Sequence, residues 1–297
     1  MPRIIIIAGP TASGKSELAF SIAEKCSGVI INADSQQIYR ELPILTARPT
    51  VVEEARIPHR LYGFLPVSEP CSAGKWLNLA RMEIDWTLSQ AMVPIVTGGT
   101  GLYLKALLHG IAEMPDIAPE VRLQASNDYD AMGKEAFAER LKAVDPDFFD
   151  RLKSFDQQRL IRAYEVWLGS GKSLSWWQGQ GVKPIYPADY FTIYQVDLPR
   201  DELYRRCNQR FLNMIEQGAI EEVRQFQGSE LGTRDSGIIG VKELSAYLRQ
   251  EIILEQAISA SQQATRNYAK RQLTWFRHQL KGAISIDSRQ LSKNFHI

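Results

Sequence analysis

Gly9-Pro10-Thr11-Ala12-Ser13-Gly14-Lys15-Ser16 matches the phosphate-loop pattern, in which two glycines separated by four residues precede Lys and Ser. The apolar run from Ile4 to Ala8 predicts a buried strand before it, and the apolar spacing from Ser16 to Cys26 predicts a helix after it. Strand, glycine loop and helix thus follow in the order of a phosphate site, whose backbone N–H groups face the anion. Lys15 would add a positive charge, and the Ser16 hydroxyl would bind Mg²⁺. A glycine-rich turn without a ligand is the alternative.

The composition is that of a globular chain of ordinary charge. Its 297 residues allow one large domain or two smaller ones, and a formal net charge of +1 excludes a protein that is basic throughout. Cys26, Cys71 and Cys207 are far apart and lack metal-ligand spacing, which indicates reduced thiols. The N-terminal apolar run is too short for a signal sequence or a membrane span. We therefore expect a cytoplasmic protein without membrane association, and we expect a monomer.

A second apolar strand, predicted at 29–33, delivers Asp34 and Ser35 at its carboxyl end, where ligands bind in open α/β sheets. Asp34 is a candidate general base for a nucleophile beside the phosphates, a role worth about 10²- to 10⁴-fold in rate. It could instead cap the next short helix. Gln36 and Gln37 carry amide groups of the kind that read base edges, although Gln at a helix start is often only solvated.

A third apolar strand, predicted at 94–96, ends in Thr97-Gly98-Gly99-Thr100-Gly101, and helical spacing resumes at 102–108. The glycines let the backbone approach a ligand closely, and Thr100 offers a hydroxyl donor for a phosphate or leaving-group oxygen. A tight turn between strand and helix is the alternative. This strand lacks the closing acid of a Walker-B element, which argues against an ATPase motor.

From about residue 114 the strand pattern disappears, and short helical patterns alternate with prolines and glycines. We interpret 114–188 as an all-helical insertion in an α/β core, a P-loop NTPase-like parallel sheet flanked by helices and formed by 1–113 and 189–297. A helix begins at Asp156, on which Arg159 and Arg162 share a face and are candidates to grip phosphates. Arg122 lies on an earlier helix of the insertion. Surface arginines are mostly solvated, so these residues alone do not establish RNA binding.

Two basic helices follow in the C-terminal part. Arg206 and Arg210 lie one turn apart on a helix predicted at 200–218, from which they could reach a diphosphate. The last helix, predicted at 254–281, belongs to a stretch without acidic residues from 256 to 286. Its basic stripe runs beside its apolar stripe and consists of Arg266, Lys270, Arg277 and Lys281. Such a basic groove edge favours contact with nucleic acid or phosphate.

Taken together, these residues resemble the signatures of the tRNA dimethylallyltransferase (tRNA isopentenyltransferase) family, in the same order and nearly from end to end. The segments that carry the resemblance are the phosphate loop, Asp34 to Tyr39, Pro58-His59, Gly98 to Tyr103, Asp156 to Arg162, Ser170 to Ser173 and Thr265 to Arg277. The resemblance implies transfer of a dimethylallyl group from dimethylallyl diphosphate to the exocyclic N6 amine of the adenosine 3′ of the anticodon, with Mg²⁺. It implies that the substrates are tRNAs reading codons that begin with U.

The resemblance also implies residue roles. The donor diphosphate would lie in the phosphate loop, where Lys15, Ser16-bound Mg²⁺ and Arg210, in preference to Arg206, neutralise the charge of the leaving group. Thr100 would donate to the bridging oxygen, and Asp34 would hold and deprotonate the adenine amine. The adenosine must flip out of the anticodon loop to arrive there. The residues expected on the RNA side, besides Asp34 and Thr100, are Ser35, Gln36, Gln37, Arg122, Gln158, Arg159, Leu160, Ile161 and Arg162.

The chain departs from the family pattern at a few positions. It has Leu45 where Gly is common, and Gly240-Val241-Lys242 where a Gly-Tyr-Lys/Arg segment is usual, so a contact from that tyrosine is not carried over. The usual Arg-Ile pair reads Arg206-Cys207, which is why we prefer Arg210 as the diphosphate contact.

Two other functions remain open. In a small-molecule kinase, Asp34 would activate a substrate hydroxyl toward ATP. The loop around Thr100 and the last basic helix argue against that interpretation. In a non-catalytic tRNA-binding protein, the fold would be kept without turnover. The presence of Lys15, Asp34 and Thr100 argues against this second alternative.

Overall fold

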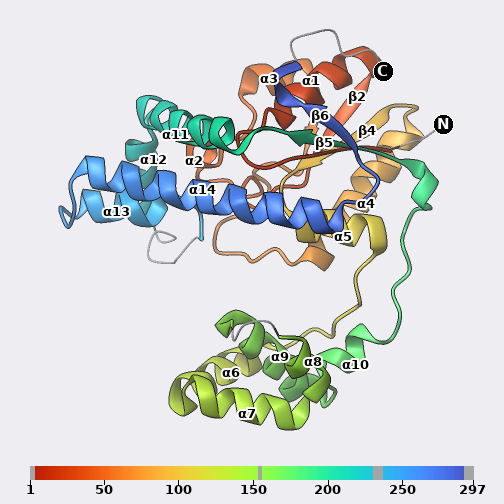
Figure 1. The fold of residues 1–297 in the computed structure, drawn as a ribbon, viewed down its shortest axis with the longest axis vertical. Coiled ribbons are helices and arrows are strands. Elements are labelled where there is room, and N and C mark those ends of the chain that lie inside the picture. The colour runs from red at the N-terminus through yellow and green to blue at the C-terminus, as the bar shows by residue number, and fades with distance from the viewer. Residues whose placement is uncertain (1–3, 153–155, 230–236, 291–297) are drawn as a thin grey trace. The chain divides into compact units, whose positions relative to one another are not determined.

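Six parallel strands form one sheet in the computed structural model, which describes residues 4–152, 156–229 and 237–290 (Figure 1). The strand order is β3-β2-β4-β1-β5-β6. The strands are β1 (Ile4–Ala8), β2 (Gly28–Asn32), β3 (His59–Arg60), β4 (Val93–Gly98), β5 (Phe191–Asp197) and β6 (Ile284–Asp287). β1 is buried along its whole length, which its four consecutive isoleucines suit, because a parallel sheet is covered on both faces. The predicted α/β fold with a parallel sheet is confirmed.

The register of the sheet brings three loops to the same edge. Ala8 of β1 pairs with Gly98 of β4, and Asn32 of β2 pairs with Thr97 of β4, so these strands end side by side. The phosphate loop, the loop after β2 and the loop after β4 therefore start next to one another. This is the carboxyl edge at which ligands bind in sheets of this kind.

Helices α1 (Lys15–Cys26) and α4 (Ala73–Ser89) pack against β2 and β4. The side chains of Leu18 and Ile22 on α1 are buried among the isoleucines of the strands. On α4, the indole N–H of the fully buried Trp76 donates to the carbonyl of Asn32 at 2.8 Å. The same ring stacks on Tyr103 of α5 with ring centroids 4.5 Å apart. The helices in the N-terminal part are α1 (Lys15–Cys26), α2 (Pro43–Thr46), α3 (Val51–Arg56), α4 (Ala73–Ser89) and α5 (Gly101–His109).

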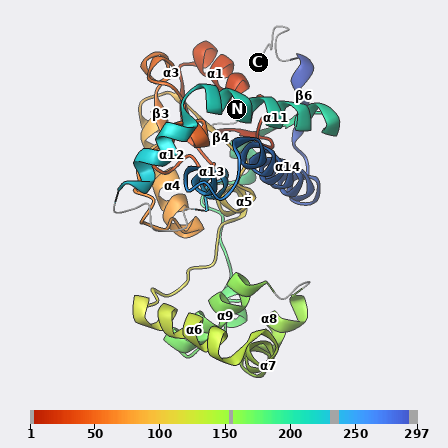
Figure 2. The same cartoon turned by 90° about the vertical axis from the view of Figure 1, so that its left-hand side faces the viewer.

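The chain divides into two compact units, each of which is described by itself. Unit 1 combines Met1–Leu108 with Tyr186–Ile297 and holds the sheet, and unit 2 is His109–Ile185. Unit 2 is built from helices (Figure 2). It has its own apolar core around Phe137, Leu141 and Tyr164. Its helices are α6 (Pro119–Met132), α7 (Lys134–Val144), α8 (Pro146–Arg151), α9 (Gln157–Ser170) and α10 (Leu174–Gln178).

The last helices of unit 1 form a second apolar cluster. They are α11 (Arg200–Glu216), α12 (Ala219–Gln227), α13 (Val241–Leu248) and α14 (Leu254–Gln279), and two short 3₁₀ helices, Ala188–Tyr190 and Ser288–Gln290, complete the elements. α14 lies beside α11 and α13 in both views (Figures 1 and 2). It buries Ala269 and Phe276 and exposes Lys270 and Arg277, so a basic stripe and an apolar stripe run along it as predicted.

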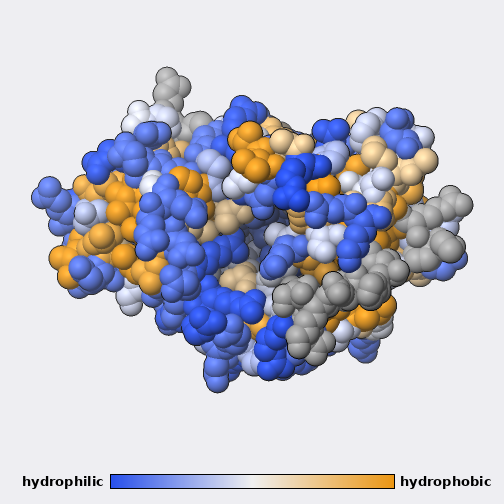
Figure 3. Space-filling view, turned by 90° about the horizontal axis from the view of Figure 1, so that it is seen from above, coloured by the Kyte–Doolittle hydropathy of each residue, from blue (hydrophilic) through white to orange (hydrophobic). Residues whose placement is uncertain are grey.

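One face of the protein is drawn in Figure 3 by the hydropathy of its residues. The face drawn in Figure 3 is mainly hydrophilic, and its apolar residues lie in separate patches. In the parts of the chain that the structure describes, no helix is both long enough and apolar enough to span a bilayer.

Candidate active site

The phosphate loop wraps the start of α1. Lys15 is buried, whereas the side chain of Ser16 is exposed. The ammonium of Lys15 donates to the carbonyl of Pro10 at 3.4 Å, so it is folded back over its own loop. A buried ammonium in this position is available to a phosphate group that enters the loop.

The charge balance of the site favours an anion. Burial lowers the pKa of Lys15 to about 8; the nearby Asp34 carboxylate opposes this change, and the Arg210 guanidinium adds to it. Burial also lowers the pKa of Arg210, and Asp34 again acts in the opposite direction. Two cations therefore share one carboxylate in a poorly solvated space. A bound diphosphate would supply the missing negative charge and would raise both pKa values.

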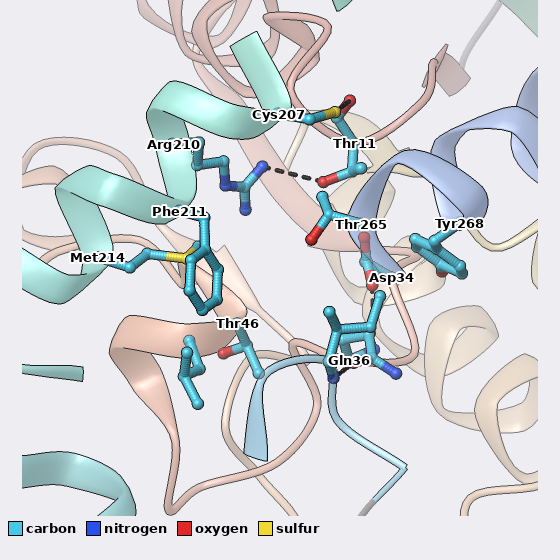
Figure 4. Close-up of a pocket in the computed structure, with 12 residues that line it drawn as sticks. Thr11, Asp34, Gln36, Thr46, Cys207, Arg210, Phe211, Met214, Thr265 and Tyr268 are labelled. Atoms are coloured by element: carbon cyan, nitrogen blue, oxygen red, sulfur yellow. Dashed lines mark hydrogen bonds between the residues drawn. The ribbon is translucent and has the colours of Figure 1, made fainter. Parts of the chain in front are cut away.

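Arg210 approaches the phosphate loop from α11. Its Nη1 atom donates to the Oγ1 atom of Thr11 at 3.1 Å (Figure 4). Arg206, one turn earlier on the same helix, pairs with Glu202 at 2.8 Å and donates to the hydroxyl of Ser288 at 2.8 Å. Of the two arginines considered from the sequence, Arg210 is thus the one held against the loop. Its contact with a diphosphate stays a prediction.

Asp34 lies directly after β2 and is buried. Its backbone N–H donates to the side-chain oxygen of Asn32 at 2.8 Å, and its Oδ1 atom accepts from the N–H of Gln36 at 3.0 Å. The carboxylate thus also closes the turn that follows, but the next helix along the described chain begins only at Pro43, so Asp34 does not cap a helix. It lines the same pocket as Thr11 and Arg210 (Figure 4). The geometry is compatible with a general base that faces the phosphate loop.

A cluster of three hydroxyl groups lies at the loop after β4. The Oγ1 atom of Thr100 accepts from the backbone N–H of Ser35 at 2.8 Å and donates to the Ser35 hydroxyl at 3.1 Å. Tyr268 on α14 lies close to both hydroxyls, which act to lower its pKa, whereas burial raises it more strongly. The two loops predicted to carry Asp34 and Thr100 are therefore joined directly.

The two glutamines after Asp34 bind backbone groups of the protein. The side-chain nitrogen of Gln37 donates to the carbonyls of Thr46 and Ala47 at 2.9 and 2.7 Å, which uses both of its hydrogens. Gln36 donates to the carbonyl of Gly237 and accepts from the N–H of Ile239, both at 3.3 Å. In this structure the two side chains hold neighbouring loops in place. Their reading of RNA bases stays a prediction.

A pocket with a cavity volume of ≈ 50 Å³ lies beside these groups (Figure 4). Its polar side is formed by Thr11, Asp34 and Arg210. The apolar residues that line it are Leu45, Phe211, Met214 and Ile239. A ligand with a charged head and a short apolar chain matches this division, because each half of the pocket can satisfy one half of the ligand.

The remaining predicted RNA contacts belong to unit 2. Arg122 and Arg162 both bind the Oε1 atom of the buried Glu165, at 3.0 and 2.6 Å, and remain partly exposed. Gln158 and Arg159 are exposed at the start of α9. These side chains are accessible to a polyanion.

One predicted RNA contact needs correction. Leu160 is fully buried in the core of unit 2, because it follows the apolar stripe of α9 with Ala163 and Tyr164. Its side chain is therefore unable to reach RNA. Its neighbour Ile161 is partly buried and packs against the same core.

The site is compatible with Mg²⁺. Among the described residues, no group of three or more His, Cys, Asp and Glu side chains is placed to hold a metal ion. The exposed hydroxyl of Ser16 offers one oxygen at the phosphate loop. Mg²⁺ is commonly bound through few protein groups together with phosphate oxygens and water, so Ser16 and a diphosphate fit its preference.

Sequence reasoning missed two side chains of α14, Tyr268 and Gln272. Gln272 is buried and bonds both the phosphate loop and the loop after β4. The helical spacing of the sequence indicates that Gln272 is buried, because Ala269 and Phe276 lie about one turn before and after it on the same buried face of α14. A polar residue on a buried stripe needs a partner, although the sequence does not say which one.

Two known protein families match most of the chain. Residues 37–279 match the family described as IPP transferase, and residues 2–63 match the one described as isopentenyl transferase. The chain is 48% identical over 286 residues to a tRNA dimethylallyltransferase of Rhodospirillum centenum, covering 96% of this chain and 91% of the relative. It is 41% identical over 293 residues to a tRNA dimethylallyltransferase of Rickettsia bellii, covering 97% of this chain and 92% of the relative.

Solved structures show the same similarity. A tRNA isopentenylpyrophosphate transferase of Staphylococcus epidermidis is 30% identical, with a TM-score of 0.68 and coverage of 98% of this chain and 95% of the other. One from Bacillus halodurans is 29% identical, with a TM-score of 0.69 and coverage of 99% and 94%. A eukaryotic dimethylallyltransferase acting on tRNA is 26% identical, with a TM-score of 0.81 and coverage of 99% and 75%.

Proposed function

The chain belongs to the IPP transferase family, that of the tRNA dimethylallyltransferases, and from this premise we propose that it prenylates an adenosine of tRNA. The donor is dimethylallyl diphosphate, and the acceptor is the N6 amine of the adenosine 3′ of the anticodon in tRNAs that read U-initial codons. One observation carries the proposal: Arg210, Asp34 and the phosphate-loop residue Thr11 line one pocket that also has an apolar part.

The donor is held by its diphosphate. Lys15 and Arg210 neutralise the phosphate oxygens, and the backbone N–H groups of the loop add further donors. The dimethylallyl chain lies against Phe211 and Met214, which line the same pocket. Negative charge grows on the leaving diphosphate as the allylic C–O bond breaks, so cations fixed in advance stabilise the transition state more than the ground state.

The acceptor reacts with help from Asp34 and Thr100. The N6 nitrogen attacks the allylic carbon, its bond to carbon forms as the C–O bond breaks, and diphosphate leaves with the bonding electrons. Asp34 accepts the proton that N6 loses, and the hydroxyl of Thr100 donates to the bridging oxygen. The adenosine reaches this place only when it is flipped out of the anticodon loop. Arg122, Gln158, Arg159 and Arg162 of unit 2 are proposed to contact the RNA.

A Mg²⁺ ion would be held by Ser16 and the diphosphate, and it would reduce the charge on the leaving group. We propose that the protein acts in the cytoplasm, where tRNA is used. We also propose that the protein acts as a monomer.

The test is a transfer assay with labelled dimethylallyl diphosphate, Mg²⁺ and bulk tRNA. We expect label in tRNA from the wild-type protein and an at least about 10²-fold lower rate of labelling from Asp34→Asn, which keeps the size of the side chain. A parallel reaction with γ-labelled ATP and small hydroxyl compounds tests the kinase alternative. Transfer of the phosphoryl label without prenylation of RNA would refute the proposal.

A further inference from the structure

Gln272 of α14 connects two loops of the active site through one side chain. Its Oε1 atom accepts from the backbone N–H of Thr11 in the phosphate loop at 2.8 Å, and its Nε2 atom donates to the carbonyl of Gly99 at 2.9 Å. The side chain is 5% exposed, so water does not compete for either bond. The two partners follow different strands, β1 and β4.

The face of α14 that carries Gln272 lies against residues 99–101 of the loop after β4. Tyr268, Gln272 and Trp275 are spaced by four and three positions and therefore share one face of the helix. A Cβ atom added to Gly99 would lie 2.2 Å from the Gln272 nitrogen, and one added to Gly101 would lie 2.3 Å from the Trp275 ring.

Between those glycines, Thr100 lies close to the hydroxyl of Tyr268 on this face of the helix. The helix thus contacts each of residues 99, 100 and 101. Because the Gly99 carbonyl is bonded to Gln272, the backbone directly before Thr100 is held at a set distance from the phosphate loop.

We propose that Gln272 is a positioning residue for prenyl transfer, which holds the Thr100 hydroxyl at the correct distance from the diphosphate bound in the phosphate loop. The inference rests on the proposed function. A carboxamide suits the task because it carries one acceptor and one donor in a single plane, and both are needed here. Glu would lack the donor for the Gly99 carbonyl, and an apolar side chain would lack both groups.

The expected effect is on turnover rather than on substrate capture. An error of about 1 Å in the position of a reacting group costs on the order of 10²-fold in rate. We expect Gln272→Met, which is close in size, to lower kcat by about that factor and to change the KM for tRNA by less than about twofold. The matched control is Gln263→Met, on an exposed position of the same helix, and should leave kcat unchanged.

A double-mutant cycle separates positioning from general support of the fold. If Gln272 acts through the Thr100 hydroxyl, Gln272→Met should lower kcat much less in a Thr100→Val background than in the wild type. If the fold-decrease in kcat of the double variant equals the product of the fold-decreases of the two single variants, the proposal is overturned. A Gln272→Met enzyme with wild-type kcat would also overturn it.

Folding is monitored in the same experiment by thermal melting of each variant. If Gln272→Met does not fold, the isosteric Gln272→Glu replaces it in the same double-mutant cycle with Thr100→Val. If neither variant folds, the role is structural and the positioning proposal is wrong. A wild-type enzyme that puts no label into tRNA would instead refute the proposed function itself.

Discussion

Arg210 donates from Nη1 to the Oγ1 atom of Thr11 across 3.1 Å, which attaches α11 to the phosphate loop over 199 positions of sequence. Arg206, one turn away, is bonded to Glu202 and Ser288. The two arginines therefore have different tasks, although the sequence spaces them as equivalent neighbours.

We expect Arg210→Met to raise the KM for dimethylallyl diphosphate by about 10- to 100-fold, because it removes one charge-assisted bond of about 1.5–3 kcal/mol to the diphosphate. Steady-state kinetics with the donor as the varied substrate measures this change. Arg206→Met is the matched control and should alter the KM by less than about threefold. Equal effects of the two substitutions would contradict the assignment.

Asp34→Asn should lower the rate of prenyl transfer by at least about 10²-fold, because an amide cannot accept the proton from N6. Binding of the donor and of tRNA should persist, since the Asn side chain still offers an oxygen to the N–H of Gln36. Single-turnover assays measure the chemical step, and filter binding measures the two affinities. An unchanged single-turnover rate would show that Asp34 is not the base.

The pKa of Lys15, lowered to about 8 by burial, predicts a pH dependence of donor capture. Only the protonated ammonium attracts the diphosphate, so kcat/KM for the donor should decline as pH rises through about 8 in the free enzyme, by up to about tenfold per unit. The measurement is kcat/KM for dimethylallyl diphosphate from pH 6 to 10. Lys15→Arg keeps the charge throughout this range and should remove the decline; a flat wild-type profile would contradict the prediction.

We expect Arg159→Ala and Arg162→Ala to weaken tRNA binding. Each should also make the slope of the logarithm of the binding constant against the logarithm of the salt concentration shallower, by about 0.7 to 0.9 for every phosphate that the arginine neutralises. They should differ in stability. Arg162 shares the buried carboxylate of Glu165 with Arg122, whereas Arg159 is exposed, so only Arg162→Ala should lower the melting temperature. Affinities measured over a series of salt concentrations, with melting curves of both variants, check this expectation. Unchanged affinity and slope would remove unit 2 from the RNA surface.

The apolar part of the pocket predicts the length of the prenyl donor. Met214 and Phe211 line it, so Met214→Ala should let geranyl diphosphate react in place of the five-carbon donor. The ratio of kcat/KM values for the two donors measures the change. Leu212→Ala, at a partly exposed position of the same helix, should leave the ratio as in the wild type.

Local patterns predicted the elements that surround the phosphate loop. A stretch of 23 consecutive residues, Ile4 to Cys26, contains the isoleucines of β1, the glycine pattern and the apolar face of α1. The meeting of Asp34 and Thr100 was also predictable, because parallel strands end at one edge of the sheet.

Other features depend on distant partners. Gln272 binds residues that are 261 and 173 positions away, so no local pattern names them. Strand β6 has only four residues at the edge of the sheet, too few for a periodic pattern. The motif around Leu160 predicts an RNA contact, whereas the helical periodicity of α9 places its side chain in the core of unit 2.

The split layout of unit 1 has a consequence for synthesis on the ribosome. β1 pairs with β4 on one side and with β5 on the other, yet 92 residues separate the end of β4 at Gly98 from the start of β5 at Phe191. At about 5–20 residues per second, the nascent chain presents one open edge of its most apolar strand for roughly 5 to 20 seconds. Cotranslational chaperones that shield such an edge should therefore matter most while unit 2 is emerging.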